Sequence, residues 1–416
     1  MKHLQHLTDV LSPGMRVFTP TMSNESALLV QDLQKNPEAA RGVNFYGIQF
    51  PGIDTTDYLS VHPESRQSGY FMTPALRAGL LTGRASLMSL DYTGIANHLQ
   101  YGEPMDLAIA QVSEPDADGW CSPGLSCDFM PLVWARARSR IAHINHRMPR
   151  IASSFRIHVS QLDASVVSEQ PLLDFNAPQV AGEIETRIGA FVAGLILDGD
   201  TLQLGIGSVP LAIATSLTSH RKLRFHGGLV SSALQTLWET GALDQDARIT
   251  TGVILGNQAF RDFSADLNNL WLAPVTETHS VSRMAGIDRF IAINSAVEVD
   301  LFGQVNSERT NGTLTAGSGG LPAFAQGALS SPGGRLLICL ASTARKGTVS
   351  RIVPALGADA VCTLPRYMAD TVITEYGVAE VRGLSLHERA HALIAIAAPG
   401  HRETLNQAWS AMRNYL

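Results

Sequence analysis

Short apolar runs alternate with helical stretches along the whole of this 416-residue chain. In the first half, the run at 106–113 (DLAIAQVS) ends at 114–119 (EPDADG), whose Pro, Asp and Gly favour a tight turn. In the second half, the run at 201–204 (TLQL) leads through a glycine-containing turn into a helical stretch. Strands separated by helices are typical of α/β architecture. The pattern therefore predicts two open α/β units of similar size.

The remaining elements support the same architecture in both halves. Further strands are predicted at 15–20, 140–145, 289–300, 335–342, 360–364 and 371–374, and helices at 27–34 and 183–197. The clearest candidate boundary lies at 165–185, because this segment is polar and contains two prolines. We therefore expect two domains, 1–180 and 181–416.

The composition excludes several classes of protein. The net charge is −6, with no long run of either sign, so nucleic acid is not an expected partner. The N-terminus has no continuous apolar segment of a signal peptide, and no apolar run approaches the roughly 18 residues of a membrane span. The four cysteines form no CxxC pair, and His143 and His146 have no third metal-ligand type nearby. We therefore expect a cytoplasmic protein with buried thiols, no membrane contact and no metal site.

The turn Gly205-Ile206-Gly207 connects a predicted strand to a predicted helix. Glycines at such a turn let backbone N–H groups approach a negatively charged oxygen, with help from the N-terminus of the helix. These donors are suited to an oxyanion hole. The alternative is a close-packed turn that needs glycine only for its conformation.

Three other segments of the second half carry candidate binding groups. The pair Gly319-Gly320 admits a ligand close to the main chain, although a plain loop is the alternative. Arg345, Lys346 and Arg351 form a basic cluster that suits phosphate groups, or else a solvated surface loop. Glu375 and Gly377 follow a predicted strand, where functional carboxylates of open sheets are found, but Glu375 is equally compatible with a charge at a helix start.

Taken together, these segments resemble the acetyl-CoA hydrolase/transferase family, which includes 4-hydroxybutyrate, acetate, butyrate and succinate CoA-transferases. The resemblance covers nearly the whole chain, and its motifs follow in the family's order at 106–124, 144–150, 202–207, 293–308, 317–328, 350–354 and 374–394. It implies an α/β fold of two similar open-sheet, CoA-transferase-type domains with the active site at their interface. It also implies coenzyme A as a substrate with no bound cofactor, acyl-CoA and a small carboxylic acid as partners, and a homodimer or homotetramer.

The resemblance further implies a covalent reaction in which a glutamate attacks the acyl-CoA. By position, Gly205 to Gly207 match the family's oxyanion turn, Gly319-Gly320 match its CoA-facing loop, and Glu375 matches a glutamate near the active site. The nucleophilic glutamate itself matches Gly228, which has no side chain, and Ala323 stands where the family usually has an aspartate. Either the alignment is locally shifted, or another group reacts, or the chain does not transfer CoA in the usual way. A shift is the weakest of these, because residues 223–241 fit the family in length.

Replacement nucleophiles would come from the loop glutamates Glu25 and Glu64, for which a solvent-exposed loop position is the alternative, or from Glu375. We expect an acyl-CoA:carboxylate CoA-transferase that acts on a short-chain or dicarboxylic acyl group. An acyl-CoA hydrolase, or a catalytically silent CoA-binding protein, is the alternative. If Gly228 occupies the nucleophile's position, Gly228→Glu should restore a carboxylate beside the glycine turn.

Overall fold

The computed structural model describes residues 2–176 and 180–415, and the chain divides into two compact units. Unit 1 contains Met1–Asn176 and Arg248–Thr278, and unit 2 contains Ala177–Ala247 and His279–Leu416. We expected a single division of the chain at residue 180, but the later segment Arg248–Thr278 belongs to unit 1. It does so because its backbone forms hydrogen bonds with loops of the first half of the chain. Cys127 donates from its N–H to the carbonyl of Gly252, and Leu272 donates to the carbonyl of Ala152. Residues 177–179 of the expected boundary lie outside the described part of the chain.

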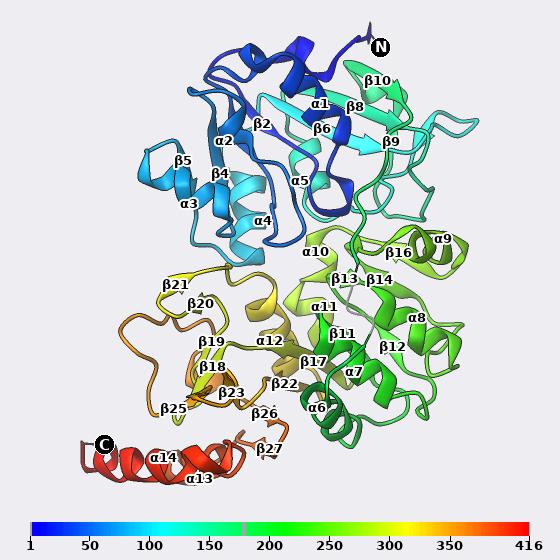
Figure 1. The fold of residues 1–416 in the computed structure, drawn as a ribbon. Helices are drawn as coiled ribbons and strands as arrows, with labels where there is room; N and C mark the ends of the chain where they lie inside the picture. The colour runs from blue at the N-terminus through cyan, green and yellow to red at the C-terminus, as the bar shows by residue number, and fades with distance from the viewer. Residues whose placement is uncertain (1, 177–179, 416) are drawn as a thin grey trace. The chain divides into compact units, whose positions relative to one another are not determined.

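Unit 1 is built on an eight-stranded sheet in which every paired neighbour is parallel (Figure 1). Its strands, in spatial order, are β1 (Lys2–His3), β10 (Ala164–Ser168), β8 (Ser139–Asn145), β6 (Leu107–Val112), β2 (Arg16–Phe18), β3 (Asn44–Tyr46), β4 (Arg66–Gly69) and β5 (Ala85–Leu87).

Both faces of the unit 1 sheet are covered, because alternate residues of each strand belong to different cores. In β6, Leu107 and Ile109 pack in one cluster, whereas Ala108 and Ala110 pack in the other. The first cluster lies against α1 (Ala27–Lys35) and α2 (Tyr58–Val61). The second lies against α4 (Tyr92–Tyr101) and α5 (Met130–Trp134), while α3 (Pro74–Leu81) packs on β4 and β5. The remaining elements of unit 1 are β7 (Trp120–Cys121), β9 (Ile157–His158), β14 (Ile249–Thr251), β15 (Val253–Ile254), β16 (Leu270–Leu272), α9 (Gln258–Asp266) and α10 (Val275–Thr278).

Unit 2 is built on a six-stranded sheet that is parallel except for its last strand. Its strands, in spatial order, are β12 (Arg224–Phe225), β11 (Thr201–Leu204), β17 (Phe290–Ser295), β22 (Arg335–Cys339), β26 (Thr371–Thr374) and the antiparallel β27 (Gly377–Glu380).

Helices cover the unit 2 sheet as well. Phe290 and Ala292 of β17 share a core with α11 (Val281–Ala285), α12 (Leu321–Ser330), α13 (Leu386–Ala395) and α14 (Pro399–Met412). Ile291 and Ile293 are also buried and point to the opposite face, because successive side chains of a strand alternate. The other α-helices of this unit are α6 (Glu183–Ala193), α7 (Ser208–Ser216) and α8 (Ser232–Glu239). Its other short strands are β13 (Leu229–Val230), β18 (Glu298–Asp300), β19 (Val305–Asn306), β20 (Arg309–Thr310), β21 (Thr313–Leu314), β23 (Thr343–Ala344), β24 (Val349–Ser350) and β25 (Ile352–Val353).

Each sheet has a point at which the strand order reverses. In unit 1, the chain runs outward from β2 through β3, β4 and β5 and then returns to β6 on the other side of β2. In unit 2, it runs from β11 to β12 and then returns to β17 on the other side of β11. The carboxyl ends of strands at such a switch point form the usual ligand crevice of open α/β sheets. The topology therefore directs attention to the ends of β2 and β6, and of β11 and β17.

The predicted α/β class with two open-sheet units is confirmed. The predicted strand at 360–364 is wrong, because this segment is turn and irregular chain with only a single bridge from Leu364 to Val305. The predicted strand at 289–300 forms two strands, β17 and β18, separated by Ala296 and Val297. Three of the four free cysteines are buried, but Cys362 is exposed, contrary to the expected burial.

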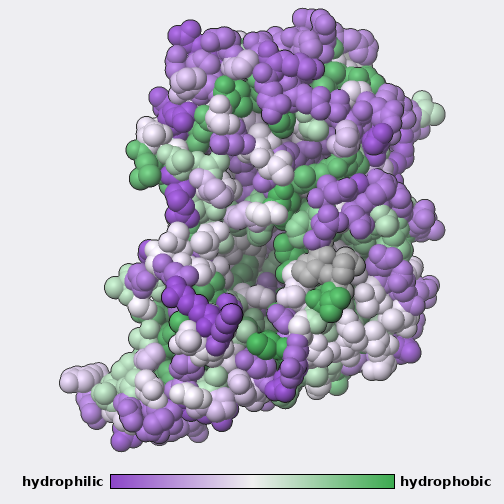
Figure 2. Space-filling model, viewed as in Figure 1, coloured by the Kyte–Doolittle hydropathy of each residue, from purple (hydrophilic) through white to green (hydrophobic). Residues whose placement is uncertain are grey.

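Hydrophilic residues cover most of the molecular face drawn in Figure 2, and hydrophobic residues gather there in smaller patches. Among the described residues, no helix is long and apolar enough to cross a membrane.

Candidate active site at the carboxyl edge of the unit 2 sheet

Two glycine turns lead into helices of unit 2. Gly207, at φ +112°, precedes α7 directly after β11, and Gly320 precedes α12. Gly207 therefore holds a backbone conformation that side-chain-bearing residues rarely adopt. Methyl groups built on Gly205 or Gly207 would have no neighbour within 4 Å, so open space lies beside this turn. The turn presents the N-terminus of α7 at the switch point, an arrangement suited to a negatively charged oxygen.

A pair of hydrogen-bonded amides, one buried and one half-buried, lies between β11 and β17 at the same switch point. The Nδ2 atom of Asn294 donates to Oε1 of Gln203 at 2.8 Å. Gln203 lies two residues before Gly205, and its side chain also flanks Gly227, since a methyl group on Gly227 would lie 3.5 Å from Cγ of Gln203. Gln203 and Asn294 are therefore polar side chains at the point of the sheet where a ligand is expected. Sequence reasoning missed both, because each is a single polar residue within a strand pattern.

The segment after β12 runs along the end of β11. The N–H of His226 donates to the carbonyl of Leu202 at 3.1 Å, which carries Gly227 and Gly228 past the carboxyl end of β11. Gly228 does not have a positive φ. Its lack of a side chain is instead required by a neighbour. A methyl group at residue 228 would lie 2.8 Å from Cε1 and 3.0 Å from Nε2 of His279.

The imidazole of His279 lies against Gly228 and Gly320 together. A methyl group on Gly320 would lie 2.4 Å from Nε2 of His279, well inside van der Waals contact. The ring also packs on Phe324, with 4.5 Å between ring centroids. Burial first, and then the neighbouring His226, lower the pKa of His279 to about 3, so this imidazole is neutral at physiological pH. A lone histidine before a helix gives no signal in the sequence, and His279 was missed.

Glu375 lies at the end of β26 and is buried. Its Oε2 accepts from the N–H of Ser342 at 2.8 Å, and its Oε1 accepts from the hydroxyl of Ser342 at 2.7 Å. The carboxylate therefore fastens the loop that follows β22. Gly377, at φ +146°, begins β27 after the two-residue turn of the β26–β27 hairpin. These contacts give both residues structural roles in the hairpin and its neighbouring loop.

Basic residues of unit 2 line a groove of about 430 Å³. Arg351 and Arg345 line it, as the sequence suggested, and Arg309 joins them from β20. Glu298 and Asp359 also line this groove, so the cations are partly balanced. Lys346, the third member of the expected cluster, is not among the lining residues. Guanidinium groups that converge on one groove suit a phosphate-bearing ligand.

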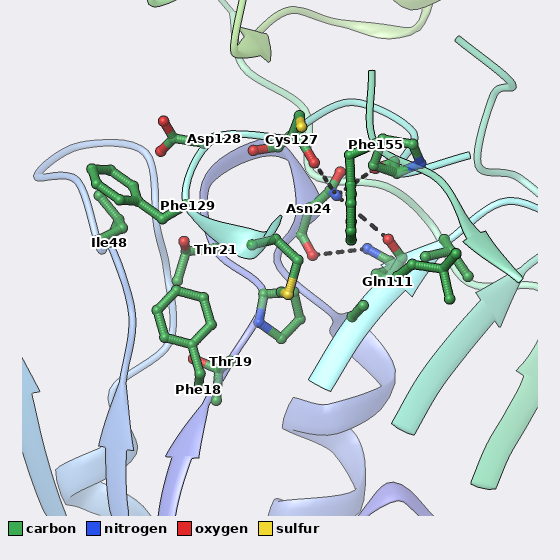
Figure 3. A pocket seen from close by; sticks show the side chains of 17 residues that line it. Phe18, Thr19, Thr21, Asn24, Ile48, Gln111, Cys127, Asp128, Phe129 and Phe155 are labelled. Carbon is green, nitrogen blue, oxygen red and sulfur yellow. Dashed lines mark hydrogen bonds between the residues drawn. The ribbon is translucent and has the colours of Figure 1, made fainter. Parts of the chain in front are cut away.

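Unit 1 has a pocket at its own switch point, between the ends of β2 and β6 (Figure 3). Its walls are largely apolar, and Asn24 fixes one side by donating from Nδ2 to the carbonyl of Pro123 at 2.7 Å. Asp128 also lines the pocket, and burial raises the pKa of its carboxyl to about 8. This side chain is thus a protonated acid through most of the neutral pH range.

The structure separates the two proposed loop glutamates. Glu25 is buried, not solvent-exposed, and its carboxylate accepts from the N–H of Thr55 at 2.9 Å and from the hydroxyl of Thr56. Glu64 precedes β4 and forms an exposed ion pair with Arg41, 3.1 Å from its Nε. Glu64 therefore lies at the amino end of the strands, away from the unit 1 pocket. Its role as a candidate nucleophile stays a prediction, and this placement does not support it.

A half-buried carboxyl group beside Glu25, that of Asp54, was also missed. Asp54 accepts from the N–H groups of Met22 at 2.7 Å and Phe50 at 2.6 Å. Burial, together with the negative charge of Glu25, raises the pKa of Asp54 to about 7. Within residues 2–176 and 180–415, no group of three His, Cys, Asp or Glu side chains is arranged to hold a metal ion.

Comparisons with known proteins agree with this arrangement. The acetyl-CoA hydrolase/transferase N-terminal domain matches residues 1–174, and the C-terminal domain of that family matches residues 256–409. The chain is 35% identical over 403 residues to a 4-hydroxybutyrate coenzyme A transferase of Clostridium kluyveri, covering 94% of this chain and 92% of the relative.

Solved structures give the same result. The structure of RipA from Yersinia pestis superposes with a TM-score of 0.89 at 26% identity, covering 98% of this chain and 96% of that one. The structure of a 4-hydroxybutyrate CoA-transferase from Porphyromonas gingivalis superposes with a TM-score of 0.81 at 28% identity. The match covers 99% of this chain and 96% of that one. The resemblance read from the motifs is confirmed, and the chain belongs to the acetyl-CoA hydrolase/transferase family.

Proposed function

We propose that this protein is an acyl-CoA:carboxylate CoA-transferase that acts on a short-chain or dicarboxylic acyl group. The observation that carries the proposal is the open glycine turn Gly205–Gly207 at the unit 2 switch point, which presents the N-terminus of α7 at the carboxyl end of β11. Backbone donors at such a turn stabilise the oxyanion that forms when a thioester carbonyl is attacked. The Clostridium relative is named for 4-hydroxybutyrate, and we propose an acid of similar size for this chain.

The groove lined by Arg309, Arg345 and Arg351 supplies a second element of the proposal. We assign it to the phosphates of coenzyme A. Binding energy from that distant part of the substrate can be used to position the thioester at the reacting centre. Arg351→Gln is therefore expected to raise KM for acyl-CoA while leaving the KM for the carboxylic acid unchanged. A matching rise in both constants would contradict this assignment.

The direct test is an exchange assay. The protein is incubated with acetyl-, butyryl- or succinyl-CoA and a panel of small carboxylic acids, and new acyl-CoA species are measured by mass spectrometry. A transferase forms the acceptor's CoA ester and releases no free thiol. Absence of exchange and of CoA binding across the panel would refute the proposal.

Hydrolysis is the second candidate, favoured by one observation. Gly228 has no side chain where the family's nucleophilic glutamate is expected, so a water molecule is a possible acceptor there. Release of free thiol without any acceptor acid would identify a hydrolase, whereas strict dependence on the acid excludes it. Tight CoA binding in calorimetry, with neither exchange nor hydrolysis, would instead identify a catalytically silent binding protein.

We further propose that the enzyme works in the cytoplasm as a homodimer or homotetramer, without a bound cofactor. The four cysteines are all free thiols, which agrees with a reducing compartment. Light scattering coupled to size-exclusion chromatography would give the oligomeric state, and a monomer at micromolar concentration would contradict that part of the proposal.

A further inference from the structure

The last two α-helices of unit 2, α13 and α14, are joined by a hydrogen bond between two ring side chains (red in Figure 1). The indole Nε1–H of Trp409 on α14 donates to Nδ1 of His387 on α13 at 2.9 Å. Trp409 is buried and makes a T-shaped contact with Phe302, with 5.7 Å between ring centroids. His387 is exposed. The bond thus links a buried donor to an imidazole that can exchange protons with water.

Only a neutral imidazole can accept this bond. An indole N–H is a donor and never an acceptor, so Nδ1 of His387 carries a lone pair and the ring proton lies on Nε2. A protonated imidazole has a donor at both nitrogens, and two N–H groups cannot bond to each other. Histidine is the side chain that ordinarily gains its charge between about pH 8 and pH 5. Acidification in that range therefore removes the acceptor of the Trp409 indole, and a buried donor is costly to leave unpaired.

The charged groups around His387 act in both directions. His391, one turn further along α13, places its ring perpendicular to that of His387 with 4.4 Å between centroids, so protonation of both rings would bring two cations into contact. Arg413, one turn beyond Trp409 at the end of α14, adds a positive charge on the other helix. Glu388, next to His387 in the chain, favours the protonated ring by its negative charge. Two cationic groups therefore oppose one anionic group.

The helix α14 also supports one wall of the basic groove. Nε2–H of His401, in the first turn of α14, donates to the carbonyl of Gly347 at 3.0 Å, and it can do so in either charge state. Gly347 lies in the turn of the β23–β24 hairpin, where Arg345, Lys346 and Gly347 have φ values of +49°, +56° and +91°. Residues with side chains rarely adopt such values, so this turn is strained and depends on its supports. The same hairpin brings Arg345 to the groove.

We propose that α13 and α14 form a pH-sensitive clamp on the coenzyme groove, fastened by the hydrogen bond between His387 and Trp409. At neutral pH the imidazole holds α14, and α14 supports the β23–β24 hairpin through His401. As the pH falls the bond is lost, α14 loosens on α13, and the hairpin that carries Arg345 becomes less ordered. This inference rests on the proposed assignment of the groove to coenzyme A, and it adds the regulation of that site.

The indole signals of the protein test the fastening directly. Each of the five tryptophans gives one indole signal in a nitrogen–proton correlation spectrum of isotope-labelled protein, and Trp409→Phe identifies the signal of Trp409. We expect this signal to move between about pH 8 and pH 5 in the wild type, and to stay in place in His387→Gln, whose amide oxygen accepts at either pH. The matched control His391→Gln should keep the movement. A wild-type signal that does not move would overturn the inference, whether or not any variant folds.

The effect on the groove is measured as the KM for acyl-CoA. We expect this KM to rise by about fivefold between about pH 8 and pH 5 in the wild type, the size of effect that the loss of one hydrogen bond produces, and to rise less in His387→Gln. The variant keeps every ionisation of the coenzyme phosphates, so the difference between the two proteins belongs to the clamp. An equal rise of KM in both proteins would overturn the link to the groove.

The measurements separate this inference from the function on which it rests. If calorimetry finds no CoA binding at neutral pH, the assignment of the groove is refuted, and the indole signals still decide whether His387 fastens α14. If CoA binds and is exchanged while the Trp409 signal stays in place at every pH, the clamp is refuted and the transferase proposal stands.

Discussion

Gly228→Ala tests whether His279 excludes a side chain from residue 228. The added methyl group would lie 2.8 Å from Cε1 and 3.0 Å from Nε2 of the imidazole, and 3.6 Å from Cζ of Phe324. The ring is held between this site, Gly320 and Phe324, so it has little room to withdraw. Overpacking of this kind costs about 1–3 kcal/mol of unfolding free energy.

The assay is a double-mutant cycle measured by urea denaturation. In the His279→Ala background the ring is gone, and the methyl group at 228 is expected to cost little. The coupling energy between the two substitutions should therefore be about 1–3 kcal/mol. Gly205→Ala is the matched control, because a methyl group there has no neighbour within 4 Å and Gly205 does not have a positive φ. We expect this control to be neutral or to stabilise by about 0.4–1 kcal/mol, through the less flexible unfolded chain.

Two results would refute the reasoning. One is a Gly228→Ala protein as stable as Gly205→Ala, and the other is an equal cost of Gly228→Ala with and without the His279 ring. The same geometry revises the expectation for Gly228→Glu. Since the obstacle is the imidazole and not a positive φ, the single variant should destabilise the protein without creating a reactive glutamate.

Three further outcomes are expected. Gly377→Ala should lower the unfolding free energy by roughly 1–3 kcal/mol, because Gly377 has a φ of +146°, which other residues rarely adopt. The control Gly400→Ala in α14 should cause no such loss, because a methyl group there has no neighbour within 4 Å. Equal stability of the two variants would contradict this prediction. Asp128→Asn should change the pH dependence of stability. Burial raises the pKa of Asp128 to about 8 in the folded protein, compared with about 3.9 in the unfolded chain. Between about pH 4 and pH 8 the folded state therefore holds a proton that the unfolded state has lost. The unfolding free energy should fall by about 1.4 kcal/mol for each unit by which the pH rises in this range. Asp128→Asn should remove this pH-dependent contribution to stability, whereas the control Asp118→Asn, at an exposed position, should not. Plots of unfolding free energy against pH that run parallel for Asp128→Asn and wild type would contradict the prediction. Glu375→Gln should lower the unfolding free energy by about 1.5–3 kcal/mol, because it disturbs the two hydrogen bonds that the carboxylate accepts from Ser342. The effect should be non-additive when this change is combined with Ser342→Ala. Fully additive losses, or a loss of turnover with no loss of stability, would show that Glu375 acts in some other way.

The sequence by itself determined the α/β class, the glycine turns and the family. The spacing of apolar residues and the turn residues specify secondary structure from neighbouring positions in the chain alone. Each motif can likewise be recognised without knowing which residues pack against it in space. The turn Gly205–Gly207 was found in this way, because a strand, two glycines and a helix are consecutive in the chain. The empty position at Gly228 was likewise visible in the sequence.

Only the tertiary structure decided what surrounds these residues. Glu25, Glu64 and Glu375 are alike in sequence as loop carboxylates, yet two are buried and held by hydroxyl and N–H donors, while Glu64 is paired with Arg41 on the surface. The placement of His279 against Gly228 joins residues 51 positions apart and depends on how the segment before α11 packs beside α12. A lone histidine leaves no periodic signal, and its pKa is set by burial, which the order of residues does not specify.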